Sequence, residues 1–192
     1  MNIKKFGNHL WQLTQFGIVN IYFVEEADGL TLIDMGMGGS TKRILQAAEV
    51  VGKPIRRMLL THAHSDHAGG LDGAVAALPE AELLLGERTA VFLRDPDARK
   101  PLPTEPQVKL SGSFVSSSVT PARTIADGDR VGSLCVVASP GHSPDHLAYY
   151  DERDGSLIAG DALQTLGGVA VAGVVRWRFP LPGWATWHLP TA

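Results

Sequence analysis

Four side chains of the kinds that bind metal ions fall within six consecutive residues. The run HAHSDH at residues 62–67 contains His62, His64, Asp66 and His67. An isolated histidine is usually a structural residue whose hydrogen bonds are satisfied. Several imidazoles packed together are a different case, because they repel one another when protonated and are costly to desolvate unless a cation holds them. The run therefore predicts a metal site.

The run lies where a predicted strand gives way to a predicted helix. Residues 54–60 end in an apolar stretch typical of a buried strand, and the apolar-rich residues 71–78 are typical of a helix. Alternate residues of an extended segment point the same way, so we expect His62 and His64 to converge on one ion. The aspartate and the third histidine begin the next turn and point elsewhere. One short segment can thus serve two neighbouring metal positions.

Two further candidate ligands come later in the chain, each directly after a predicted strand. His142 follows the apolar residues 134–138, and Asp161 follows residues 156–159. Because the strand ends of paired sheets share one rim, we expect both side chains to lie beside the histidine run. His146, in the same loop as His142, is interpreted as a residue that orients a ligand or as a structural residue.

The remaining pattern indicates strands first and helices after in each half of the chain. Residues 95–120 contain four prolines and a serine-rich patch, which predicts an irregular connection that covers one side of the site. Ser40 or Thr41 is expected to cap the first helix. The predicted strands are 10–13, 18–24, 30–33, 55–60, 81–85, 123–126, 134–138, 147–150 and 156–159, and the predicted helices are 42–51, 71–78 and 86–94.

Composition excludes several classes of protein. The chain has 192 residues, of which 44% are hydrophobic and 19% charged, and its net charge of −3 with no long basic run argues against a nucleic-acid partner. The lone Cys135 excludes an internal disulfide and is expected to be a small core residue. No signal peptide or membrane-spanning stretch is apparent. We therefore expect a soluble, cytoplasmic protein with a small-molecule substrate and no membrane partner.

These motifs resemble those of the metallo-β-lactamase superfamily. The resemblance rests on residues 62–67, on His142 and Asp161 with their preceding glycines, and on Asp34 at a strand end, and it extends over residues 8–165. It implies an α/β fold, the four-layer αβ/βα sandwich, with a hydrolytic metal site along one edge between the sheets.

The resemblance also implies a single domain and a set of ligands. The domain would span residues 1–192, with a first half at 1–94, the connection at 95–120 and a second half at 121–192. Asp34 would hold the loop that carries the histidine run without touching metal. The implied ligands of the first ion are His62, His64 and His142, those of the second are Asp66 and His67, and Asp161 bridges both.

The implied activity is zinc-dependent hydrolysis. Histidine rather than glutamate at position 64 favours zinc over iron, with two Zn²⁺ expected per chain and one possible. In this family a metal-bound hydroxide attacks a carbonyl group, and Asp66 or a metal-bound water protonates the leaving group. A thioester or a lactone is the expected substrate. Ser65 and Ser143 are interpreted as loop formers, because this chemistry requires no serine nucleophile.

One departure from the family concerns the end of the second half. The family's second metal takes a late histidine, and only His188 follows Asp161. Its context predicts the start of a helix, so we do not expect it to be a ligand. The second half also lacks a closing strand and helix, so we expect its C-terminal part to be incomplete. The second metal position would then be weak, open to water or filled from another chain. An exposed apolar edge would favour a homo-oligomer or poor solubility.

Two other functions stay open. The absent late histidine is compatible with a metal-binding protein that has little or no turnover. A phosphodiesterase or nuclease of the same fold is a further alternative, against which the acidic balance argues. Near the C-terminus, Arg176 and Arg178 either meet an anionic substrate or are solvated. The aromatic side chains there either line an apolar wall of the site or pack on the core; they are Trp177, Phe179 and Trp184.

Overall fold

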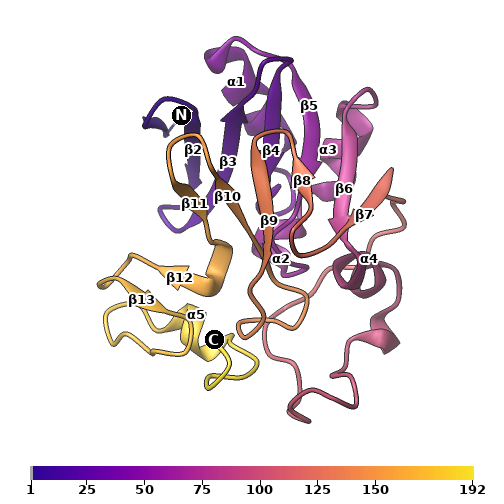
Figure 1. Ribbon diagram of the computed structural model, residues 1–192, viewed down its shortest axis with the longest axis vertical. Helices are drawn as coiled ribbons and strands as arrows, with labels where there is room; N and C mark the ends of the chain where they lie inside the picture. The colour runs from indigo at the N-terminus through magenta and orange to yellow at the C-terminus, as the bar shows by residue number, and fades with distance from the viewer. Residues whose placement is uncertain (1) are drawn as a thin grey trace.

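A computed structural model describes residues 2–192 (Figure 1). Its larger sheet has seven strands. The strands follow one another in chain order across the sheet, antiparallel from β1 to β4 and parallel from β4 to β7. Six of the seven were predicted, and β1 was not. Their bounds are β1 Ile3–Phe6, β2 Leu10–Gln15, β3 Val19–Glu25, β4 Leu30–Ile33, β5 Ile55–Leu59, β6 Glu82–Gly86 and β7 Arg123–Ile125.

A smaller, antiparallel sheet faces the first. Its strand order is β11-β10-β9-β8, and a separate two-stranded sheet pairs β12 with β13. The predicted strand at 123–126 is β7, which pairs with β6 in the larger sheet, so the smaller sheet starts only at β8. The bounds are β8 Arg130–Val131, β9 Leu134–Ala138, β10 Leu147–Asp151, β11 Ser156–Ile158, β12 Leu163–Gln164 and β13 Ala170–Val171.

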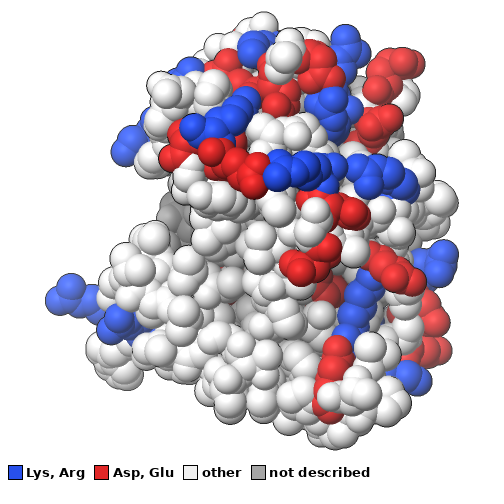
Figure 2. Space-filling view, viewed as in Figure 1, with Lys and Arg blue, Asp and Glu red and all other residues white. Residues whose placement is uncertain are grey.

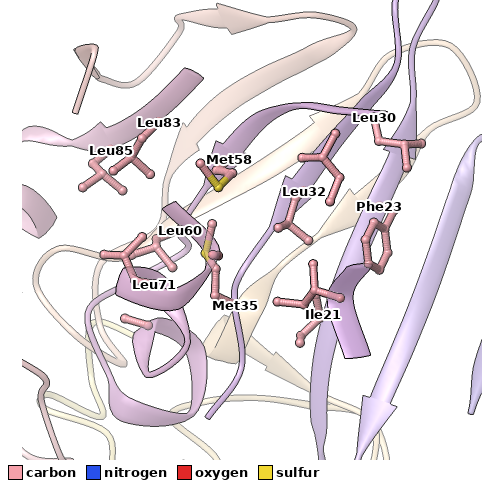
Figure 3. Close-up of a cluster of buried hydrophobic side chains, with 14 of the residues drawn as sticks. Ile21, Phe23, Leu30, Leu32, Met35, Met58, Leu60, Leu71, Leu83 and Leu85 are labelled. Atoms are coloured by element: carbon pink, nitrogen blue, oxygen red, sulfur yellow. The ribbon is translucent and has the colours of Figure 1, made fainter. Parts of the chain in front are cut away.

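Strand alternation divides the apolar side chains between two cores. Along β3, Phe23 contributes to the core beneath the helices, whereas Val24 contributes to the core between the sheets. Leu32 and Ile33 divide in the same way on β4. Successive side chains of a strand point to opposite faces, so a continuous apolar run indicates a strand buried on both sides. Figure 3 shows side chains of the first core converging from neighbouring strands and from Leu71 of a helix.

The helices of the first half cover the outer face of the larger sheet. Their buried residues, such as Ile44 and Leu71, belong to the first core. Ser40 is the N-cap residue of α1 as predicted, but its hydroxyl bonds Met37 and Gln15 and does not cap the helix. The helices are α1 Thr41–Val51, α2 Ser65–Ala68, α3 Leu71–Ala77, α4 Glu87–Arg94 and α5 Leu181–Trp184, with 3₁₀ turns at Pro96–Ala98 and Gly160–Ala162.

The smaller sheet has an outer face that the described residues leave exposed. After β7, residues 126–192 contain no helix longer than the four-residue α5. Val137, Tyr150 and Leu157 are consequently 37–49% exposed. Cys135 was expected in the core but is partly exposed, because alternation on β9 directs its neighbours inward. The metallo-β-lactamase type of sandwich is confirmed, and residues 2–192 supply three of its layers: helices, larger sheet and smaller sheet.

Charge and apolar surface are unevenly distributed. In Figure 2 charged side chains of both signs gather over the upper part of the molecule, whereas the part around β12, β13 and α5 shows no red on this face and shows blue only at its left edge. Residues 162–192 contain no aspartate or glutamate. Within residues 2–192, no helix combines the length and the apolarity that crossing a bilayer requires.

Candidate metal centre

The histidine run sits on a loop that follows β5 and is held by Asp34, which follows β4. Asp34 adopts a left-handed backbone conformation with φ of 62°, one that aspartate tolerates better than most residues. Its carboxylate accepts hydrogen bonds from the Thr61 backbone N–H at 2.7 Å and the Thr61 hydroxyl at 2.9 Å. It also faces His67 Nδ1 at 2.7 Å. Asp34 thus anchors both ends of the run, the role that the family resemblance implies.

Three imidazoles converge beyond this anchor. His62 Nε2 lies 3.0 Å from His64 Nδ1, and His64 Nδ1 lies 3.0 Å from His142 Nε2. All three side chains are at most 3% exposed. Convergence of His62 with His64 from alternate positions follows from the extended backbone at the end of β5. The loop after β9 brings His142 to the same point, as expected from the shared rim of the two sheets.

The hydrogen-bond partners of His62 Nδ1 and His64 Nε2 show which nitrogen of each ring carries the lone pair. Thr61 Oγ1 donates to the Asp34 carboxylate and therefore accepts from His62 Nδ1, 3.0 Å away. The Ser111 carbonyl oxygen, which can only accept, lies 3.1 Å from His64 Nε2. Each ring in its neutral form has one N–H, so His62 Nε2 and His64 Nδ1 carry the lone pairs. These are the two atoms that face each other.

The tautomer of His142 follows from its hydrogen-bond partner in the same way. Its Nδ1 faces Thr186 Oγ1 at 3.2 Å, and that hydroxyl donates to the Pro182 carbonyl at 2.7 Å. His142 Nδ1 is therefore the donor, and Nε2 holds a lone pair that points at the other two. Three lone pairs at this separation repel unless a positive charge lies among them. The donor set fits a cation that favours imidazole nitrogen.

The protonation of the three rings is consistent with a metal site. Burial, reinforced by the neighbouring imidazoles, lowers the pKa of His62 well below 6.5 and that of His64 to about 3. Burial also lowers the pKa of His142, although Asp161 opposes it. The rings are therefore neutral at pH 7, and their lone pairs are available to a metal without displacement of a proton.

A second group of ligand atoms adjoins the first. His62, His67 and Asp161 each offer one atom within 4.8 Å of the others, as do the three imidazoles of the first group. His67 Nε2 lies 3.3 Å from Asp161 Oδ1, and His142 Nε2 lies 3.4 Å from Asp161 Oδ2. Asp161 thus lies between the two groups, where the family resemblance expects a bridging ligand.

His67 and Asp161 are coupled electrostatically. Burial alone would lower the pKa of His67, but the carboxylates of Asp161 and Asp34 raise it well above 6.5. Burial would raise the pKa of Asp161, whereas His67 and His142 bring it below its usual range. The pair therefore attracts a positive charge, which either a proton or a metal ion can supply.

Two candidate residues stand apart from these groups. Asp66 on α2 lies 3.7 Å from His67 Nε2 and has a side chain that is 44% exposed, but it belongs to neither three-ligand group in residues 2–192. His188 belongs to neither group as well, and its Nδ1 contacts Thr191 Oγ1 at 2.6 Å. That His188 is not a ligand stays a prediction.

The loop after β9 is tied to the histidine run by residues that the sequence pattern did not single out. The buried Asp145 accepts from the Ala63 backbone N–H at 3.0 Å and from the Ser143 hydroxyl at 2.5 Å. His146 accepts from the Asp161 backbone N–H at 3.1 Å, and its other nitrogen bonds Ser139 at 2.7 Å. His146 therefore holds the backbone of Asp161, which is compatible with the ligand-orienting role that was one of its two interpretations.

Residues 111–114 of the irregular connection cover one side of the site, and we call them the strap. Ser113 O accepts from the Ser65 backbone N–H at 2.7 Å, and Phe114 stacks edge-on against His64 with ring centroids 4.6 Å apart. Gly112, at φ of 85°, packs so close to His64 that a Cβ atom would overlap the imidazole. The predicted cover over one side of the site is therefore confirmed.

A pocket of about 180 Å³ opens over the metal centre. Of the aromatic side chains near the C-terminus, Phe179 lines this pocket, whereas Trp177 and Trp184 are 93% and 68% exposed and do not. Arg176 bonds the Val169 carbonyl at 2.7 Å, and neither Arg176 nor Arg178 is among the residues described as lining the pocket. The full lining is Ile18, Val19, Asn20, Tyr22, His64, Ser65, Asp66, His67, Gly112, Ser113, Gly160, Asp161, Phe179, Leu181, Pro182 and Ala185.

Comparison with known proteins finds relatives over most of the chain. YobT of Bacillus subtilis is 42% identical over 93% of this chain and 78% of its own length. The probable metallo-hydrolase YybB of the same organism is 27% identical over 86% and 74%. A hydroxyacylglutathione hydrolase of Methylobacterium nodulans is 32% identical over 65% of this chain, which matches only 40% of that enzyme.

A family profile and a solved structure agree with these relatives. The profile of the Metallo-beta-lactamase superfamily matches residues 14–186. BJP-1, a subclass B3 metallo-beta-lactamase of Bradyrhizobium japonicum, superimposes with a TM-score of 0.61 at 26% identity, over 78% of this chain and 56% of BJP-1. The chain therefore belongs to the metallo-beta-lactamase superfamily and groups there with its metallo-hydrolases.

Proposed function

We propose that the chain is a zinc-dependent hydrolase of carboxylic thioesters or lactones. The observation that carries this proposal is the convergence of three imidazole lone pairs, from His62, His64 and His142, at separations of 3.0 Å. Imidazole with one or two carboxylates is a donor set that suits zinc. His67 and Asp161 would hold a second ion, and Asp66 lies within reach of that position.

The chemistry is hydrolysis of an activated carbonyl group. Bound metal ions would lower the pKa of water and stabilise negative charge on a carbonyl oxygen. The water oxygen bonds to the carbonyl carbon, the bond from that carbon to sulfur or oxygen breaks, and the leaving atom takes a proton. The products are a carboxylate and a thiol or hydroxyl group.

Two side chains in the pocket are suited to assist this reaction. Asp66 is the proposed proton carrier to the leaving atom, since its carboxylate is partly exposed in the pocket beside His67. Tyr22 lines the same pocket, and burial together with the charges of Asp34 and Asp161 raises its pKa to about 12. The Tyr22 hydroxyl therefore stays protonated and is a hydrogen-bond donor for a substrate oxygen.

Metal content and hydrolysis of a substrate panel test the proposal together. We expect elemental analysis to find zinc in the purified protein, and chelation to abolish hydrolysis of a phenyl thioester or a γ-lactone until zinc is restored. His142→Gln should weaken zinc binding by more than about 100-fold, since it removes a ligand rather than an outer partner. His188→Gln is the matched control and should bind zinc as the parent does.

The outcomes of these measurements distinguish the three candidate functions. Failure to take up zinc or any other divalent metal on titration would exclude the metallohydrolase. Tight metal binding without hydrolysis of the panel would favour a metal-binding protein with little turnover. Hydrolysis of bis-nitrophenyl phosphate in preference to thioester and lactone would favour the phosphodiesterase.

A further inference from the structure

The pocket over the metal centre has a polar base and apolar walls. His64, Asp66, His67 and Asp161 lie at the base. The turn before β3 forms one wall. The segment around α5 forms the other wall, which comprises Phe179, Leu181, Pro182 and Ala185.

Several wall side chains are apolar yet open to water. Ile18 is 45% exposed and Leu181 is 52% exposed. Burial of such surface by an apolar group of a ligand stabilises the complex. An apolar group that extends from the reacting carbonyl therefore gains most by lying between these walls.

The described lining offers no counter-ion for an anionic group. No lysine or arginine occurs among the pocket-lining residues within 2–192. Arg176 is bonded to the Val169 carbonyl. The polar side chains of the lining beyond the four at the base are all neutral, namely Asn20, Tyr22, Ser65 and Ser113. A carboxylate on the substrate arm would lose its hydration without gaining a charged partner, which is costly.

We propose that the pocket selects substrates whose acyl arm is short, apolar and uncharged. This inference rests on the proposed function and names the substrate class of the same site. The volume of about 180 Å³ supports a short arm, because sites for drug-sized ligands are typically ~300–1,000 Å³.

A pair of substrates that differ in one carboxylate tests this selection. The S-phenyl thioesters of hexanoate and of adipate have acyl arms of equal length, and only the adipoyl arm ends in a carboxylate. With the zinc-loaded protein we expect kcat/KM for the hexanoyl thioester to exceed that for the adipoyl thioester by about tenfold or more. Equal values, or a preference for the adipoyl thioester, would overturn the proposal.

A substitution in the pocket wall tests whether the protein selects against a charged acyl arm. Leu181→Arg places a cation at the pocket rim, and it should raise kcat/KM for the adipoyl thioester and lower it for the hexanoyl thioester. Leu102→Arg is the matched control, because Leu102 is 53% exposed and does not line the pocket. If the ratio of the two kcat/KM values is unchanged in Leu181→Arg, the assignment of Leu181 to the pocket wall is contradicted.

Calorimetric binding separates failure of the inference from failure of the proposed function. Titration of hexanoate and of adipate into the zinc-loaded protein measures arm selection without turnover. Tighter binding of hexanoate, with neither thioester hydrolysed, would refute the hydrolase and uphold the selection. Hydrolysis of both thioesters with no difference in binding would uphold the hydrolase and refute the selection.

Discussion

At the scale of single residues, the contact between Gly112 and His64 decides how one imidazole is presented. The neighbouring Ser111 carbonyl lies 3.1 Å from His64 Nε2 and so leaves the Nδ1 lone pair facing the metal centre. Gly112 permits this approach because it has a φ of 85° and no Cβ atom to meet the ring. The strap therefore orients His64 through the backbone.

Substitution of Gly112 tests this contact. Gly112→Ala should push the strap away from His64 and reduce zinc affinity by about 10–100-fold, the range found when an outer partner of a ligand is lost. Competition titration with a chromophoric chelator measures the affinity.

A matched glycine controls for backbone strain. Gly128 has nearly the same φ, 83°, and nothing lies within 4 Å of its added Cβ. Gly128→Ala therefore carries the same conformational cost and should leave zinc affinity unchanged. Equal losses of affinity in both variants would assign the effect to strain and not to the contact with His64.

At the scale of elements, Asp145 joins the loop after β9 to the loop after β5. The side chain is 4% exposed, and burial raises its pKa. It accepts from the Ala63 backbone N–H, which lies between two ligand histidines in sequence, and from the Ser143 hydroxyl. This carboxyl group therefore ties the loop that carries His142 to the histidine run, alongside the backbone hydrogen bond from Leu147 N–H to the Thr61 carbonyl.

Removal of Asp145 should destabilise the fold. Asp145→Ala leaves the buried Ala63 N–H without an acceptor and should lower the free energy of unfolding by about 1–3 kcal/mol. Asp145→Asn retains an acceptor for that N–H and should recover most of the loss. Urea denaturation measures both. The exposed Asp97→Ala is the control, and an equal loss in that variant would refute the assigned role of Asp145.

At the scale of the whole molecule, an apolar surface extends over the later part of the chain. Val169, Trp177 and Trp184 are 68–93% exposed, and residues 162–192 carry no acidic group. Exposed apolar patches of this kind favour association. The homo-oligomer expected from the sequence stays a prediction, and we propose this surface as its interface.

Gel filtration over a range of concentrations tests self-association. We expect the apparent mass to rise with concentration, and the double variant Trp177→Ser, Trp184→Ser to shift the protein toward a monomer. Val50→Ser removes a half-exposed apolar side chain on α1 and should have no such effect. A parent protein that elutes as a monomer at every concentration would contradict the expectation.

The sequence by itself determined the features that depend on local spacing. Alternation in the run after β5 predicts that His62 and His64 point to one place. The apolar run of β4 and the apolar end of β5 predict buried strands, and the ends of the predicted strands predict the rim where His142 and Asp161 meet the histidine run. Each of these follows from backbone periodicity, which a short stretch of residue types is enough to reveal.

Only the tertiary structure decided the features that depend on distant partners. The lone pair of His64 is set by the carbonyl of Ser111, 47 residues away, and a backbone carbonyl carries no residue-type signal. Thr186 sets the tautomer of His142 in the same way. The strand at 123–126 pairs with β6 and not with the smaller sheet, because strand partners are chosen by long-range packing. Local pattern thus indicated which histidines approach the metal centre, and long-range contacts specified how each imidazole is oriented.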